Sequence, residues 1–118
     1  MMKTPIETYD WFSVVAVPFP FTDSARSKRR PALILSSTGN FGGKIGHSVM
    51  AMITSANNPP WPLDIRIRDL APAGLASESI IRMKLFTLDH RLIDRLLGSL
   101  SARDSEQVKL SLRDLLGM

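Results

Sequence analysis

The chain has 118 residues, 44% of them hydrophobic and 22% charged, with no cysteine and a formal net charge of +4. This composition predicts one globular domain over residues 1–118 and excludes a disordered tail. Without cysteine there are no disulfides, thiolate nucleophiles or Cys-based metal sites, and we expect a protein of a reducing compartment, the cytoplasm. The longest apolar run, residues 12–21, contains two prolines and follows two acidic residues, so it is typical neither of a signal peptide nor of a membrane span.

Most of the positive charge lies on one segment. Residues 23–30 hold four basic residues and one acidic residue, a local charge of +3 out of +4: Arg26, Lys28, Arg29, Arg30 and Asp23. A patch of this kind attracts a polyanion such as RNA or DNA, or an acidic protein segment. The alternative is a solvated loop that only keeps the protein soluble.

Five short apolar runs predict β-strands. Each is rich in β-branched residues or alternates apolar with polar residues, and turn-forming residues separate them. The expected strands cover residues 12–21, 31–37, 47–53, 63–68 and 79–88, and the first should stop near Pro18 because proline cannot continue the pairing. Residues 92–100 repeat leucine and isoleucine at roughly helical spacing but contain Gly98, so this segment is either a helix or a twisted strand.

The last segment predicts an amphipathic helix. Its apolar residues recur at i, i+4, i+7 and i+8, namely Val108, Leu112, Leu115 and Leu116, and its N-cap is Ser101, Asp104 or Ser105. Several short strands with one terminal helix predict a mainly β fold, a bent antiparallel sheet that closes partly into a barrel with the helix packed on it. Such a sheet has open edges, so we expect a homodimer that covers one of them.

Few kinds of catalytic chemistry fit these residues. The glycines match no phosphate-binding or dinucleotide-binding spacing and the acidic residues are scattered singly, so we expect no cofactor and no metal site. A ribonuclease with two catalytic histidines would need His47 and His90, but ordinary positions at the ends of predicted elements explain both. The remaining candidate for catalysis is an arginine beside hydroxyl groups. A guanidinium donates two hydrogen bonds to phosphate oxygens, although its pKa of about 13 makes it a poor proton donor.

Four stretches of the chain, taken together, resemble a known family. In order they are "VVAVPFPFTDSARSKRRPALILS", "MAMITSA", "DIRIRDLAPAGLASESIIRMKLFTLD" and a final "LLGSL" followed by the helix. Their combination is similar to the MazF/PemK family of bacterial toxin endoribonucleases over about nine tenths of the chain, although each piece alone is a weak signal.

The resemblance implies an SH3-like antiparallel β-barrel with a C-terminal α-helix, which dimerises and cuts single-stranded RNA at short sequence motifs without a metal, through a 2′,3′-cyclic phosphate. It also implies a cognate antitoxin, whose acidic and hydrophobic tail occupies the RNA groove and holds the toxin inactive. The cleavage centre of the family maps onto Arg30, directly before the proline of the second strand, and onto Thr54 at the end of the third, with Ser55 as its neighbour.

The basic segment is expected to act as a flexible lid that gathers the RNA phosphates, through Arg26, Lys28 and Arg29. Arg30 is expected to be held at a strand edge instead, because Pro31 constrains the backbone next to it. Ser27 and Ser55 are further RNA-binding candidates.

Five further residues are candidates for RNA contacts. Arg82 and Lys84, on the polar face of the fifth strand, contact phosphates or the antitoxin, or else form a solvated face. Phe19, Phe21 and Trp61 either stack on unpaired bases or serve as packing residues beside the prolines.

One position departs from the family pattern. The family commonly has a Gly-Asp pair before the first strand, where this chain has Phe12 and Ser13, so the turn into that strand is left open. Two rival functions also stay open. One is a non-catalytic toxin of the same fold that binds a protein target such as DNA gyrase, and the other is an RNA-binding module that has lost activity, against which the retained Arg30 and Thr54 argue.

Overall fold

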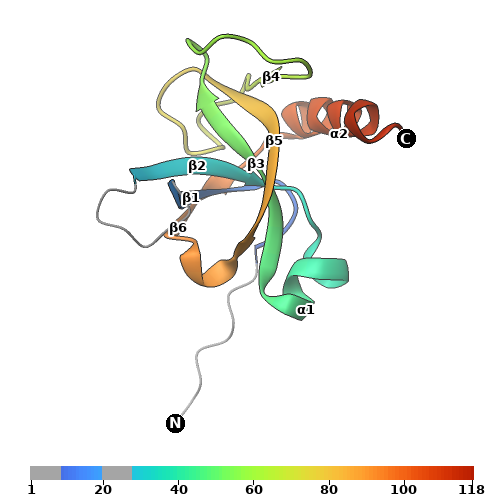
Figure 1. The fold of residues 1–118 in the computed structure, drawn as a ribbon. Coiled ribbons are helices and arrows are strands. Elements are labelled where there is room, and N and C mark those ends of the chain that lie inside the picture. The colour runs from blue at the N-terminus through green and yellow to red at the C-terminus, as the bar shows by residue number, and fades with distance from the viewer. Residues whose placement is uncertain (1–8, 20–27) are drawn as a thin grey trace.

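Antiparallel strands form one curled sheet in the computed structural model of the protein, in the order β4-β5-β3-β2-β1-β6 (Figure 1). The structure describes residues 9–19 and 28–118, and within them the strands are β1 (Ser13–Phe19), β2 (Lys28–Ile34), β3 (His47–Ser55), β4 (Ile65–Arg66), β5 (Ser79–Asp89) and β6 (Arg95–Ser99). Helix α2 (Ala102–Leu116) follows β6, and short helical turns join the strands: η1 (Thr38–Gly42), α1 (Gly43–Ile45) and η2 (His90–Leu92).

The mainly β fold with a C-terminal helix is therefore confirmed as a curled half-barrel with α2 packed at one end (Figure 1). None of the helices in the described part of the chain is long and apolar enough to cross a membrane. The single domain and the homodimer stay predictions.

The sheet is buried on both of its faces. Successive residues of the central strands point into two apolar clusters, so that Val14 and Leu33 lie in one cluster while Val15 and Ile34 lie in the other. Helix α2 closes the first cluster through the fully buried Val108. Because side chains alternate along a strand, burial on both faces explains why these strands read as continuous apolar runs.

β1 ends next to the expected stop at Pro18, whereas β2 begins three residues earlier than expected. β1 continues through Pro18 to Phe19, and β2 begins at Lys28, because Phe19 pairs with Lys28 and Pro18 pairs with Arg29. On its other side β1 pairs with β6 only as far as Ala16, so Pro18 interrupts no ladder there. Lys28 and Arg29 therefore belong to a strand, which corrects the expectation that they lie in a flexible lid.

β4 is only two residues long, although the alternation over residues 63–68 predicted a longer strand. Leu63 has a left-handed backbone (φ 67°), which ends the extended geometry on one side. On the other side the N–H groups of Arg68 and Asp69 donate to the buried Asp104 carboxylate of α2 over 2.9 to 3.1 Å. Ser101, one of the three candidate caps, accepts from the Asp104 N–H and is the N-cap of α2.

Residues 95–99 form a strand, so the segment that could have been a helix or a twisted strand contains the strand. Two glycines allow this strand to lie close to a neighbouring loop. A Cβ on Gly98 would lie 2.2 Å from the Pro72 carbonyl oxygen, and one on Gly74, whose φ is 72°, would lie 2.1 Å from that of Leu97. The Ser99 N–H donates to the Pro72 carbonyl at 2.9 Å. Gly98 thus allows β6 to lie directly against the loop of residues 72–74.

Phe12 takes a left-handed conformation (φ 66°) at the turn into β1. Its N–H donates to the Ile34 carbonyl and its carbonyl accepts from the Leu100 N–H, both at 2.9 Å, while its ring stacks on Trp11 with centroids 5.3 Å apart. The chain thus adopts, without glycine, a conformation that glycine reaches at little cost, at the position where the resemblance implies a glycine.

Gly98→Ala should destabilise the fold, because the added methyl group would meet a backbone carbonyl that cannot move aside cheaply. We expect the free energy of unfolding in urea to fall by about 2–4 kcal/mol. Gly39→Ala is the matched control, since nothing lies within 4 Å of its added methyl group. Equal stability of the two variants would contradict the close approach of β6 to residues 72–74.

Candidate active-site cleft

A cleft opens where the ladder between β2 and β3 ends. The two strands pair as far as Ala32 opposite Met52, and the register continued by two residues sets Arg30 of β2 across from Thr54 of β3. The strands are not paired at this point. Arg30 and Thr54 consequently line one open cleft of about 210 Å³.

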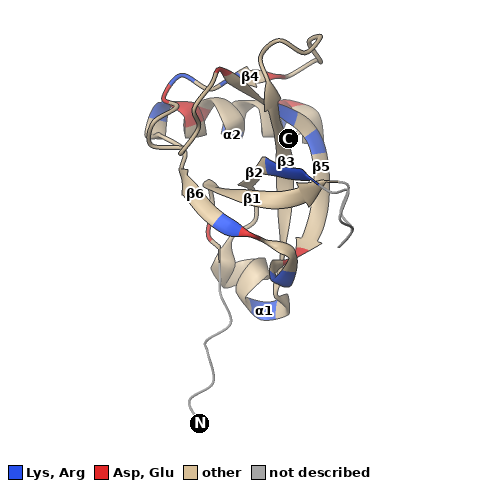
Figure 2. Cartoon of the chain, turned by 90° about the vertical axis from the view of Figure 1, so that its left-hand side faces the viewer, with Lys and Arg blue, Asp and Glu red and all other residues tan. Residues whose placement is uncertain are grey.

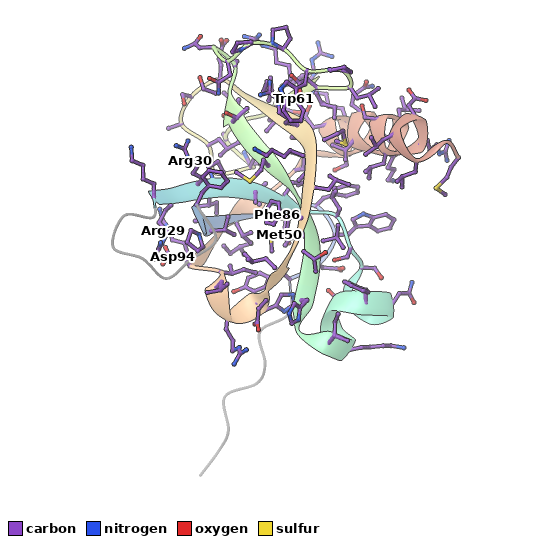
Figure 3. All side chains as sticks on the ribbon, in the orientation of Figure 1. Arg29, Arg30, Met50, Trp61, Phe86 and Asp94 are labelled. Carbon is purple, nitrogen blue, oxygen red and sulfur yellow. The ribbon has the colours of Figure 1, made fainter. Side chains whose placement is uncertain are left out.

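The lining comes from β1, β2, β3, β5 and the loop after β3. It consists of Phe19, Arg30, Met52, Ile53, Thr54, Trp61, Arg82 and Lys84. Figure 2 shows the basic residues of β2 and β5 on neighbouring parts of the sheet, and Figure 3 shows Arg30 beside β2 and Trp61 towards the end of the sheet where α2 lies. Both predicted cleavage residues and four of the other candidates, Phe19, Trp61, Arg82 and Lys84, therefore meet in one place.

Ser55 does not line this cleft. Its Oγ accepts the N–H of Asn57 at 3.2 Å, within the turn that follows β3. Neighbouring residues of a strand point to opposite faces, so Thr54 presents its side chain to the cleft and Ser55 does not.

Of the basic segment the structure describes residues 28–30, and among these only Arg30 lines the cleft. Arg29 lies near Asp94 instead, with 3.5 Å between its Nε and the Oδ1 of that residue (Figure 3). Lys28 is exposed at the start of β2. Arg26, Ser27 and Phe21 lie outside the described residues.

Arg30 and Lys84 flank one aromatic ring. The Arg30 Cζ lies 5.7 Å and the Lys84 Nζ 5.8 Å from the centroid of Phe19. Both basic side chains are exposed, and the ion pairs within the described part of the chain include neither of them. Two uncompensated cations at the mouth of a cleft favour the binding of an anion such as a phosphodiester.

Arg82 has a different environment. Its Nε and Nη2 donate to both carboxylate oxygens of Asp64 at 3.2 and 3.0 Å, and its Nη2 also donates to the Pro59 carbonyl at 2.7 Å. The side chain is 11% exposed, and its Cζ lies 4.9 Å from the centroid of the Trp61 ring. Arg82 therefore joins the loop after β3 to the sheet and supports Trp61 at the cleft.

Asp64 completes this arrangement. Burial by itself would raise the pKa of Asp64, but hydrogen bonds from Arg82 and from the Trp61 N–H, together with the charge of Arg82, outweigh burial and lower the pKa below its usual value. Asp64 thus stays ionised and holds both Arg82 and Trp61 in place.

Sequence reasoning missed two residues of the site. Asp64 lies in the alternating run of residues 63–68, whose pattern predicted a solvated strand face for it. Only its contacts with Arg82 show that it holds the site together. Asn58, whose Nδ2 donates to the Thr54 Oγ1, gave no signal beyond its place in a turn-forming stretch.

The two histidines lie outside the cleft lining. His90 is buried with its Nε2 2.7 Å from the Ser48 Oγ, and His47 lies next to Asp89. Across residues 9–19 and 28–118, no three His, Asp or Glu side chains gather in a group that could hold a metal ion.

These features define a small β half-barrel protein with a cationic, hydroxyl-bearing cleft. A family model described as the PemK-like, MazF-like toxin of type II toxin-antitoxin systems matches residues 11–116. The chain belongs to this family, and the expected family is confirmed. By this description it is the toxin of a type II toxin-antitoxin system.

Solved structures of MazF toxins share the fold. The MazE–MazF complex from Deinococcus radiodurans matches with a TM-score of 0.76 and 26% identity, over 95% of this chain and 99% of that chain. MazF alone from the same organism matches with a TM-score of 0.74 and 24% identity, over 95% and 99%. The Mycobacterium tuberculosis toxin MazF-mt6 matches with a TM-score of 0.69 and 17% identity, over 90% and 97%. The search of curated proteins gives no match.

At acidic pH, protonation of Asp64 should weaken the hydrogen bonds that hold Trp61 in place. Because the pKa of Asp64 is lowered when folded, its stabilising contacts are complete above the ordinary carboxyl value of 3.8 and are lost as the pH falls through the lower, folded value. In a Trp11→Phe protein Trp61 is the only tryptophan, so its fluorescence should change below pH 3.8, with circular dichroism reporting that the fold persists.

Asp64→Asn in that background should show the altered emission already at pH 7 and no acid transition. Asp69→Asn is the control, because it removes a different carboxyl, whose pKa is lowered to about 2 mainly by the Arg103 hydrogen bond. An acid transition of Trp61 that persists in Asp64→Asn would contradict the assignment.

Proposed function

We propose that this toxin is a metal-independent endoribonuclease that cleaves single-stranded RNA at specific sequences and thereby inhibits translation and growth. The observation that carries the proposal is the meeting of Arg30 and Thr54 in one cleft, where Arg30 has no ion pair among the described residues. A similar structure at 15% identity and a TM-score of 0.70, covering 93% of this chain and 96% of that chain, is an endoribonuclease in complex with its cognate antitoxin from a mycobacterial species.

The proposed reaction is an internal transfer within the RNA. The 2′-oxygen attacks the neighbouring phosphorus as its proton is lost, the bond from phosphorus to the 5′-oxygen breaks, and that oxygen takes up a proton. The products are a 2′,3′-cyclic phosphate and a 5′-hydroxyl. Arg30 stabilises the negative charge that grows on the phosphoryl oxygens, and Thr54 contacts the phosphate or orients the 2′-hydroxyl.

The remaining lining residues bind the RNA on either side of the scissile bond. Lys84 holds a neighbouring phosphate, and Phe19 and Trp61 offer rings for unpaired bases, each such stack contributing about 1–3 kcal/mol. Lys28 and Arg29, at the start of β2, extend the basic surface, to which Arg26 and Ser27 are proposed to add.

The antitoxin is proposed to inhibit by competition. An acidic tail would meet the same uncompensated cations, Arg30 and Lys84, that bind the RNA phosphates, so the two ligands exclude each other. We propose further that the toxin acts in the cytoplasm as a homodimer. No contact in the described structure favours the alternative of a non-catalytic toxin that binds DNA gyrase.

Arg30→Ala should abolish RNA cleavage, because nothing else in the described cleft replaces its two-point contact with the phosphate. We expect single-turnover cleavage of a long single-stranded RNA, measured with EDTA present, to fall by about 100-fold or more, with the melting temperature changed by no more than a few degrees. Arg113→Ala is the matched control, since Arg113 is exposed in the last turn of α2 and lies outside the cleft lining. Full activity of Arg30→Ala, or a wild-type protein that cuts no RNA, would end the proposal. Mass spectrometry should find the cyclic phosphate at the new 3′ ends.

Binding to single-stranded RNA should weaken steeply with salt. Each phosphate contact contributes a slope of about −0.7 in a plot of log affinity against log salt concentration. Lys84→Ala should therefore make the slope less negative by about 0.7, whereas Lys44→Ala, an exposed change in α1, should leave it unaltered. Identical slopes for wild type and Lys84→Ala would exclude Lys84 as a phosphate ligand.

A further inference from the structure

The turn that follows β3 folds a side chain back onto Thr54. The Asn58 N–H donates to the Ser55 carbonyl at 3.1 Å, and the Asn57 N–H donates to the Ser55 Oγ at 3.2 Å, which closes the turn. From this turn the Asn58 Nδ2 donates to the Thr54 Oγ1. Among the described residues that line the cleft, Thr54 alone carries a hydroxyl, and this hydroxyl is therefore already an acceptor before any ligand binds.

That contact restricts what the hydroxyl can do. A threonine hydroxyl has two lone pairs and one proton, and the amide N–H of Asn58 occupies a lone pair. The proton remains, and the hydrogen bonds among the described residues contain none that the Thr54 hydroxyl donates. Since the Thr54 side chain lines the cleft, its proton is available to an acceptor that enters there.

The loop that carries Asn58 is held from its other end as well. Arg82 donates to the Pro59 carbonyl at 2.7 Å, and Asp64 accepts both from Arg82 and from the Trp61 N–H. Three prolines between residues 59 and 62 further limit the backbone. The amide of Asn58 is thus fixed in advance, and orienting Thr54 requires no rearrangement when RNA binds.

We infer that Asn58 is a positioning residue that commits the Thr54 hydroxyl to donate its proton to a non-bridging oxygen of the scissile phosphate. The inference rests on the proposed ribonuclease function and narrows it, because it assigns the Thr54 proton to the phosphate. Asn58 acts through Thr54 and touches no reacting atom itself.

The test compares Asn58→Ala and Asn58→Asp with wild type on a short RNA that contains one mapped cleavage site. Asn58→Ala should slow single-turnover cleavage by about five- to tenfold, as expected for the loss of one hydrogen bond. Asn58→Asp should slow it by about 100-fold, because its carboxylate accepts the Thr54 proton and turns it away from the phosphate. Affinity for the uncleavable analogue with a 2′-deoxyribose at the site should change by less than about threefold in Asn58→Ala, since the contact matters to the reaction more than to binding.

Two controls separate positioning from a general loss of structure. Asn57→Ala changes the preceding residue of the same turn, whose side chain makes no hydrogen bond to Thr54 in the described structure, and should keep cleavage within about twofold of wild type. In a Thr54→Val background Asn58→Ala should have no further effect on the rate, because the hydroxyl through which it acts is gone. A sulfur in place of the accepting phosphate oxygen should slow wild type and should slow Thr54→Val much less.

Additive effects of Asn58→Ala and Thr54→Val, or an Asn58→Asp enzyme as active as wild type, would overturn the inference while leaving the proposed ribonuclease intact. A wild-type protein that cuts no RNA overturns the proposed function instead. In that case NMR still tests the hydrogen bond from Asn58 to Thr54. The side-chain amide signals of Asn58 should shift in Thr54→Val, and those of Asn57 should not. Unshifted Asn58 signals would overturn the hydrogen bond itself.

Discussion

The register between β2 and β3 is the constraint on which the rest of this molecule depends. The two strands have both faces buried, so a slip of one residue would exchange the apolar sets of the two clusters and would be costly. With Ala32 held opposite Met52, the positions two residues further out on each strand must face each other. Those positions are Arg30 and Thr54. The packing of the core therefore determines where the candidate site lies, which is just beyond the last paired residues of β2 and β3.

A second layer of interactions keeps the cleft in shape. Loops at the end of a sheet are generally its most mobile parts, yet this one is joined to β5 by a largely buried ion pair and to β3 by the Asn58 amide. An ion pair of this kind contributes geometry more than stability, because removing two charges from water offsets much of their attraction. The arrangement keeps the Trp61 ring and the Thr54 hydroxyl in fixed directions, as the proposed binding of a flexible RNA strand requires.

Charge is distributed by role in this site. Arg82 is paired with Asp64 and holds the loop after β3 to the sheet. Arg30 and Lys84 form no ion pair among the described residues and are open to an anionic ligand. Of these three basic residues, one therefore supports the structure of the cleft and two are available to a ligand. The same open cations explain how an acidic antitoxin segment and RNA can be proposed to compete for a single surface.

The sequence alone determined the parts of this protein that local patterns control. Apolar runs marked the main strands, the spacing of Val108, Leu112 and Leu115 marked α2, and the order of motifs identified the family. The same motifs predicted Arg30 and Thr54 as the cleavage residues. Nothing local could reveal the rest. Residues 95–99 form a strand because Gly98 meets Pro72, and β4 is short because Asp104 accepts from the N–H groups of residues 68 and 69. Arg82 faces a carboxylate 18 positions earlier in the chain. Each of these outcomes depends on a contact between distant segments, and such contacts exist only once the chain has folded.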